Sequence, residues 1–278
     1  MNDRHTIHRV LVALDASPHS RAALKVAAEL AADLQAELLG MFIEDINLLR
    51  LAQLPCAREV AYATRGIRAV DSQRLEHTLR MQAAQLEHML ASVAQGRNVP
   101  WSFRVSRGHV AKELLAAAEE GDVLVLGRVG TSVMQRTRLG STAQTVVAMA
   151  RHTVVFLEHG VELGVPVLVL FDGTEGAMRA MVTAARLTRG NERNLVVLLA
   201  SDDRDTQQRL QQQASSRLAA QGRGARFCPL APGTISLINA VKREGGKALV
   251  LAGDHALAKE KTLADLMRQV RCPVVLVR

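Results

Sequence analysis

The feature that most constrains the fold is an internal repeat. The run "VLVALDAS" (residues 10–17) matches "VLVLFDGT" (167–174), because both are apolar stretches that end in Asp, a small residue and a hydroxyl residue. Three matched segments in the same order indicate a duplication. The other two pairs are "GDVLVLG" (121–127) with "GKALVLAG" (246–253), and "RHTVVFLE" (151–158) with "RCPVVLVR" (271–278).

The duplication predicts two domains, residues 1–160 and 161–278, joined by the short polar link "EHGVELG" (158–164). A chain of 278 residues is long enough for two domains of ordinary size. No apolar run approaches the roughly 20 residues that a membrane-spanning helix needs, and the N-terminus shows no secretory signal pattern. Cys56, Cys228 and Cys272 are far apart and form no CxxC motif, which is typical of a reduced, cytoplasmic protein.

The charge of the chain is +8, and it is uneven: the first domain carries +2 and the second +6. A basic half can attract nucleic acid. However, aromatic residues make up only 3 %, so bases would find few stacking partners. We therefore regard nucleic acid as an unlikely partner and expect a solvated, arginine-rich surface.

Within the first domain, apolar strands alternate with amphipathic helices. Continuous apolar strands of this kind predict a parallel sheet covered by helices on both faces, in which ligands bind at the carboxyl ends of the strands. Asp15 and Gly127 both stand at such ends. The expected strands are 9–15, 36–43, 101–106, 122–127 and the segment after 150; the expected helices are 18–35, 72–95, 109–120 and one ending near 150; residues 44–70 are expected to be an irregular insertion.

The segment "GRVGTSVMQRTRLGST" (127–142) joins the fourth strand to a helix. Its glycines let the backbone approach a ligand closely, and backbone N–H groups at a helix N-terminus favour an anion. Arg136 and Arg138 add positive charge. The parts suit a di- or triphosphate, although a glycine-rich turn with a capping hydroxyl is the alternative. Neither a G-x-x-x-x-G-K-[ST] loop nor a G-x-G-x-x-G fingerprint is present.

The spacing G-x2-G-x9-G-[ST] resembles that of the universal stress proteins, as do "VLVALDASPHS" at the first strand and "MFIED" at the end of the second. The resemblance covers both repeats. It implies an α/β, Rossmann-like fold in each domain, with a five-stranded parallel sheet in the order 3-2-1-4-5 flanked by helices. It also implies a cytosolic ATP-binding protein of stress response or signalling, with Mg²⁺ or Mn²⁺ bridging the phosphates.

The resemblance further implies which residues contact the nucleotide. Ala13, Leu14 and Phe42 would face adenine, partly through backbone, and Asp15 and Gly127 would lie near the ribose. The phosphates would lie in the glycine loop. The complete predicted contact set is Ala13, Leu14, Asp15, Phe42, Leu126, Gly127, Val129, Gly130, Gly140, Ser141 and Thr142.

The second domain departs from this pattern. Its corresponding segment, "GDHALAKEKTLADL" (253–266), is shorter, has one glycine and carries Asp254, Glu260 and Asp265. Because carboxylates repel phosphate, we expect one nucleotide site per chain. Family dimers pair through the last strand, so the resemblance implies an internal pseudo-dimer in which "HTVVFLE" meets "CPVVLVR". A further homodimer is an open expectation.

Asp15 has two interpretations, because Asp172 is kept in the repeat that lost the loop. Its carboxylate contacts ribose or metal, or it only caps the following turn. The first functional hypothesis is therefore an ATP-binding protein without catalysis. The second is a slow ATP hydrolase that would need Asp15 as base, and the third is a nucleotide-free module that binds a partner. The insertion at 44–70 could cover the site.

Overall fold

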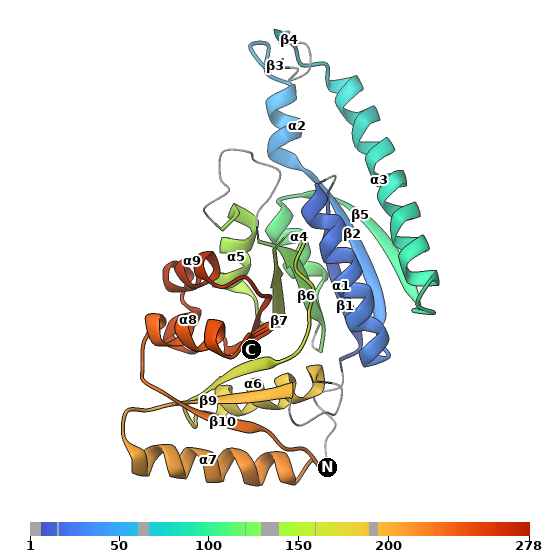
Figure 1. The fold of residues 1–278 in the computed structure, drawn as a ribbon. Helices are drawn as coiled ribbons and strands as arrows, with labels where there is room; N and C mark the ends of the chain where they lie inside the picture. The colour runs from blue at the N-terminus through green and yellow to red at the C-terminus, as the bar shows by residue number, and fades with distance from the viewer. Residues whose placement is uncertain are drawn as a thin grey trace.

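The computed structural model describes residues 7–15, 17–60, 67–119, 121–128, 139–158, 160–188 and 194–278. Residues 1–160 are called the first half below, and residues 161–278 the second half. The main sheet takes five strands from each half (Figure 1). They are β1 (Arg9–Leu14), β2 (Glu37–Asp45), β5 (Trp101–Gly108), β6 (Val123–Gly127) and β7 (Thr153–Leu157), then β8 (Val167–Phe171), β9 (Leu195–Ala200), β10 (Arg226–Leu230), β11 (Ala248–Ala252) and β12 (Val274–Val277).

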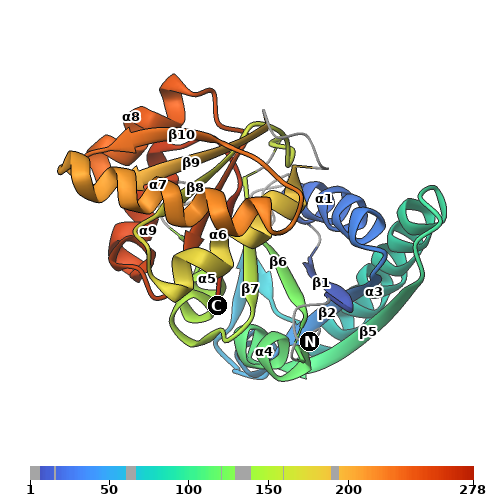
Figure 2. The same ribbon diagram turned by 90° about the horizontal axis from the view of Figure 1, so that it is seen from below.

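The ten strands lie in the order β10-β9-β8-β11-β12-β7-β6-β1-β2-β5. Each half therefore has the order 3-2-1-4-5, and its neighbouring strands are parallel. The predicted fold class is confirmed, including the strand order that the family resemblance implied. Figure 2 shows the two halves side by side, the first in blue to green and the second in yellow to red.

Helices cover both faces of the sheet, and two apolar clusters fill the space beneath them. One cluster packs the first face under α1, α3, α6 and α7, and the other packs the second face under α4, α5, α8 and α9. Along β1, Val10 and Val12 enter the first cluster and Leu11 the second, as the alternation of side chains in a strand requires. The helices are α1 (Pro18–Leu34), α3 (Ser72–Gln95), α4 (Val110–Ala117), α5 (Ser141–Met149), α6 (Glu175–Leu187), α7 (Arg204–Ala219), α8 (Thr234–Arg243) and α9 (Glu260–Gln269), with a 3₁₀ turn, η3 (Ala256–Ala258).

The first helix begins where the sequence predicts. Ser17 is its N-cap and accepts a hydrogen bond from the Ser20 N–H at 3.2 Å, with a proline in the first turn. A hydroxyl cap satisfies one of the N–H groups that a helix start leaves unpaired. Several other predicted ends differ from the observed ones by one to three residues, which is ordinary for helix and strand boundaries.

The two halves join along β7 and β12, which pair antiparallel with Val155 opposite Val275. The pairing of "HTVVFLE" with "CPVVLVR" is thus observed. Helices α5 and α9 also contact each other across this line. We call the β7–β12 pair together with α5 and α9 the seam. It makes one continuous sheet out of two repeats, so the apolar clusters run across both halves.

The prediction that residues 44–70 are irregular was wrong. The segment forms a short helix, α2 (Ile46–Ala52), and a two-stranded antiparallel sheet of β3 (Arg58–Val60) and β4 (Ile67–Ala69). Asp45 starts α2 by accepting the Asn47 N–H at 2.9 Å. In Figure 1 this insertion and the start of α3 stand away from the main sheet. A seven-residue helix is too short to produce a clear periodic signal in the sequence.

Among the described residues, no helix has the length and apolar character needed to cross a membrane.

Candidate functional site

The predicted adenine contacts lie at the carboxyl ends of three neighbouring strands. β1 pairs with β2 on one side and with β6 on the other, and Leu14 stands directly opposite Phe42. Both of these side chains are buried, as is Leu126 near the end of β6, whereas Ala13 and Gly127 are half-buried. The buried side chains therefore form the floor beneath this edge of the sheet. Contacts to a ligand would come from the backbone and from the two half-buried positions.

Asp15 follows β1 and is held by local hydrogen bonds. Its Oδ1 accepts the Ser17 N–H at 2.9 Å and also the Ser17 hydroxyl, and its own N–H donates to Ser20 Oγ at 2.9 Å. Asp172 makes the same turn in the second half, where its Oδ1 accepts the N–H and the hydroxyl of Thr174 at 3.0 and 2.7 Å. The structure thus shows the capping role at both positions. A role for Asp15 with ribose or metal stays a prediction.

The far end of the glycine loop lies against the end of β6. The Gly140 N–H donates to the Arg128 carbonyl at 3.0 Å, and buried Leu139 anchors the chain next to it. Gly140 is the N-cap of α5, and among the described residues no side chain forms a capping hydrogen bond at this helix start. The first-turn N–H groups at Ser141 and Thr142 are therefore presented beside β6, which is the arrangement that binds anions at helix starts.

Glycine is not required at position 140 for backbone reasons, since its φ is −61°. A larger residue could adopt this conformation, so the absence of a side chain matters for space and charge at the helix start. Val129, Gly130, Arg136 and Arg138 lie outside the described residues, and their predicted contacts stay predictions.

Arg128 is a residue at this site that the sequence analysis missed. Its side chain is buried and turns toward the seam, where Nη1 lies 3.4 Å from Glu158 Oε2 and donates to the Val270 carbonyl at 3.3 Å. Burial lowers the pKa of its guanidinium from the ordinary value, against the opposing effect of Glu158. Nothing in the sequence separates Arg128 from the other loop residues after β6. Its role became visible only through its contact with Val270 of the second half.

The corresponding place in the second half is filled by side chains. The register of β1 with β6 and of β8 with β11 makes Gly127 equivalent to Ala252, so the sequence match of Gly127 with Gly253 was off by one residue. Asp254 follows, and its carboxylate packs so closely on Gly176 of α6 that a Cβ there would overlap it. His255 lies beside Asp172, with Nε2 3.8 Å from Oδ2.

The start of α9 also differs from the start of α5. The buried residues of the two helices have the same spacing, so that Ala143 corresponds to Leu263 and Val146 corresponds to Leu266. Gly140 then corresponds to Glu260, an acidic residue in the first turn of α9. A carboxylate at this point occupies the position where a helix start would otherwise attract an anion. The chemistry of the second half therefore disfavours a phosphate.

Within the residues that the structure describes, no group of three or more His, Cys, Asp or Glu side chains is arranged to hold a metal ion. The insertion leaves the sheet at the end of β2, next to the candidate site. There Glu44 pairs with Arg107 at 2.8 Å, and Asn47 Nδ2 lies 3.5 Å from His109 Nδ1. That the insertion covers the site stays a prediction.

The comparisons with known proteins agree with the fold. A family model described as "Universal stress protein family" matches residues 49–157. Among solved structures, a universal stress protein from Archaeoglobus fulgidus DSM 4304 has a TM-score of 0.74 and 16 % identity, over 97 % of this chain and 98 % of that chain. A functionally unknown protein from Pseudomonas aeruginosa PAO1 has a TM-score of 0.60 and 12 % identity, over 100 % and 94 %.

At these identities, the likeness to the two structures concerns the fold alone. The similarity extends over both halves, so the tandem arrangement is shared as well. No curated protein matches the chain.

Proposed function

We propose that this chain is a universal stress protein, a family whose model matches its residues 49–157, and that it binds one adenine nucleotide in its first half and acts in stress response or signalling. The observation that carries the proposal is the start of α5, which Gly140 holds against the end of β6 and which no described side chain caps. Two aligned N–H groups and the helix dipole favour an anion there.

The residues around this point suit ATP. Ser141 and Thr142 would donate backbone N–H and hydroxyl groups to phosphate, and the nucleoside would lie against the small, half-buried residues Ala13 and Gly127 at the strand ends. Asp15 would lie nearest to the ribose. The phosphates would carry Mg²⁺ or Mn²⁺ with them, since the described residues provide no metal cluster of their own. The metal would neutralise phosphate charge.

We also propose that the nucleotide changes conformation or assembly, without turnover or with slow turnover. The only base that the sequence analysis named is Asp15, whose Oδ1 accepts two hydrogen bonds from Ser17, so that only its second carboxylate oxygen could serve as a base. A general base needs a free acceptor within reach of the water. If Asp15 is not a base, Asp15→Asn should leave any residual ATP hydrolysis unchanged, whereas a drop of tenfold or more would favour the hydrolase.

The seam supports the proposal that the chain is an internal pseudo-dimer, because the last strands of the two halves pair directly. We propose a cytoplasmic location from the three free cysteines, which are not paired in disulfides.

The decisive experiment is direct titration of purified chain with ATP by calorimetry, with mass spectrometry of any nucleotide released on denaturation. We expect about one ATP per chain. Gly140→Glu gives the first half the residue that α9 carries at the corresponding position, and it should weaken binding about 100-fold, because the carboxylate meets the phosphates.

The matched control is Ala148→Glu, which adds the same charge at an exposed position near the other end of α5. It should bind ATP as the parent chain does. No binding at millimolar ATP, or equal binding by Gly140→Glu and the parent, would overturn the proposed function.

A further inference from the structure

Each end of the seam carries an arginine that contacts the opposite half, although the two arginines do not occupy equivalent positions in the repeat. At one end, Arg128 of the first half donates to the Val270 carbonyl, at the C-terminal end of α9. At the other end, Arg278 of the second half donates Nη2 to the Val147 carbonyl of α5 at 2.5 Å. Gly253 makes room for this side chain, since a Cβ there would overlap it. Each half thus reaches across the seam with a guanidinium.

The charges around these two arginines differ. Arg128 has Glu158 at 3.4 Å. The residue that corresponds to Glu158 in the second half is Arg278 itself, because each follows the last residue of the paired strand register. The second end therefore carries a cation where the first carries an acid. Arg278 Nε is buried without a hydrogen-bond partner among the described residues, and so is His152 Nδ1 nearby.

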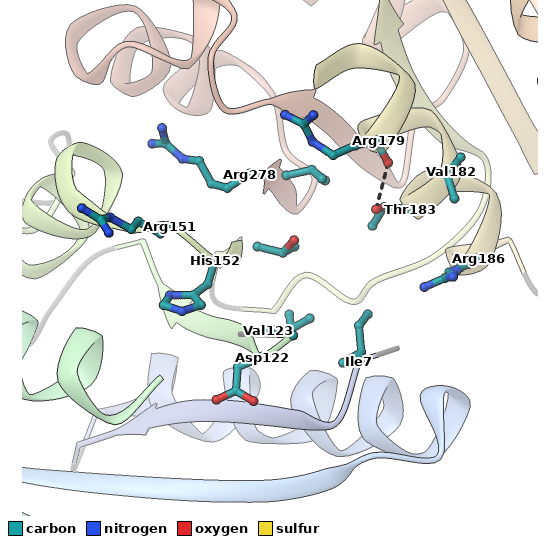
Figure 3. Close-up of a pocket in the computed structure, with 13 residues that line it drawn as sticks. Ile7, Asp122, Val123, Arg151, His152, Arg179, Val182, Thr183, Arg186 and Arg278 are labelled. Carbon is teal, nitrogen blue, oxygen red and sulfur yellow. Dashed lines mark hydrogen bonds between the residues drawn. The ribbon is translucent and has the colours of Figure 1, made fainter. Parts of the chain in front are cut away.

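A cavity of about 510 Å³ opens at this second end. Figure 3 shows side chains entering it from the starts of β6 and β7, from α6 and from the end of β12. The side chains of Arg151, Arg179 and Arg278 line it and form no ion pair with another described residue. Arg186 also lines the cavity.

The one acidic side chain among these lining residues is already neutralised. Asp122 accepts two hydrogen bonds from Arg9, at 2.6 and 3.2 Å, and a third from the Glu119 N–H at 2.8 Å. Asp122 is buried, so little of its charge reaches the cavity. The field inside is set by arginines from both halves.

We propose that this cavity, called the seam cavity below, binds a small anion that carries two or more phosphoryl groups. Guanidinium groups bind phosphate oxygens through paired hydrogen bonds, and several arginines spread around one cavity favour an anion with more than one charged group. A volume of about 510 Å³ lies within the range of small-molecule sites and exceeds what one inorganic phosphate fills.

The seam cavity is separate from the candidate nucleotide site. The cavity lies at the starts of β6 and β7, whereas Gly127 and Gly140 lie at the opposite, carboxyl end of β6. It is lined by both halves, so a bound anion would tie α6 to β6 and β7. The proposal consequently holds or fails independently of ATP binding in the first half.

The test uses the full chain and inorganic pyrophosphate and tripolyphosphate as probes, with calorimetry and the thermal midpoint as readouts. The test is made in the Gly140→Glu chain, because the proposed nucleotide site at the start of α5 would also bind these probes. In this background we expect about one probe per chain, with weaker binding of inorganic phosphate and no detectable binding of acetate. Arg179→Gln and Arg151→Gln should each weaken tripolyphosphate binding about tenfold, because each removes a charge-assisted contact. Arg151 is exposed and Arg179 half-buried, so both variants should fold.

Arg217→Gln is the matched control, because it removes one positive charge from the exposed face of α7. In the same Gly140→Glu background it should bind tripolyphosphate at the seam cavity normally, whereas the chain with Gly140 should bind a second equivalent at the start of α5. The proposal is overturned if no probe binds at millimolar concentration. It is also overturned if Arg179→Gln and Arg151→Gln bind like the parent chain, or if Gly140→Glu alone removes binding.

Discussion

The first and second halves have the same sheet, yet the same place in each has opposite chemistry. Both halves order their strands 3-2-1-4-5 and follow the first strand with an aspartate that caps a turn. At the start of the helix that precedes the fifth strand, however, the first half has Gly140 (in α5) and the second half has Glu260 (in α9). The second half also places Asp254 against α6. A parallel sheet fixes where a site can form, and the loop residues decide whether an anion is accepted.

The largest effect on the free energy of unfolding is expected at the seam, where β7 of the first half pairs with β12 of the second. Phe156 of β7 is fully buried and stands opposite Val274 of β12. Phe156→Ala should lower the free energy of unfolding by about 3–5 kcal/mol, because it removes a ring and leaves a cavity. Urea unfolding should show one transition for both halves. Two separate transitions in the parent chain would mean that the seam does not couple them.

The next largest effect tests whether the Asp254 side chain packs on Gly176 in the second half. Gly176→Ala should destabilise the chain by about 1–3 kcal/mol, because the new methyl meets the Asp254 carboxylate. Asp254→Ala combined with Gly176→Ala should recover most of the loss, as a double-mutant cycle of thermal midpoints would show. If the two changes are simply additive, Asp254 does not occupy this place in solution.

A third prediction uses another pair of equivalent positions. Cys272 of the second half is buried, whereas His152 of the first is half-buried. Burial raises the pKa of the Cys272 thiol from 9.0 to about 11, partly opposed by Arg128. The folded state thus keeps this proton to higher pH than the unfolded state. Stability from the neutral thiol is complete below about pH 9 and is lost as pH rises toward about 11.

By about pH 10.5 this loss should reach about 2 kcal/mol relative to pH 8. The measurement is urea unfolding of the parent chain and of Cys272→Ala at both pH values, since other groups titrate in the same window. Cys272→Ala should lack this share of the pH dependence, and Cys56→Ala, at an exposed position, should retain it. The prediction would be contradicted if the free energy of unfolding changed by the same amount between the two pH values in all three chains.

The smallest effect separates the two aspartates that cap equivalent turns. Asp15→Ala and Asp172→Ala should each cost about 1 kcal/mol of stability, because each removes the acceptor of a turn N–H. If Asp15 also contacts ribose, ATP affinity should fall for Asp15→Ala and stay normal for Asp172→Ala. Equal affinity for both variants would leave Asp15 with capping alone.

Some of these features could be predicted from sequence because they depend on neighbours along the chain. Ser17 caps α1 through contacts three residues away, and the alternation of apolar residues in β1 sets which face each side chain enters. The insertion was misjudged because α2 and the β3–β4 pair are too short for periodicity to identify. The correspondence of Gly127 to Ala252, and not to Gly253, could only be found from the strand register.

The sequence by itself determined the duplication, the alternation of strands and helices, and, through the family resemblance, the strand order and the pairing of the last strands. Tertiary structure alone decided that Arg128 turns into the seam and that Arg151, Arg179 and Arg278 line one cavity. The physical reason is that local periodicity and turn chemistry act within a few residues. The seam cavity instead combines side chains from both halves, such as Arg151 and Arg278, whose meeting depends on how the two halves of the sheet join edge to edge.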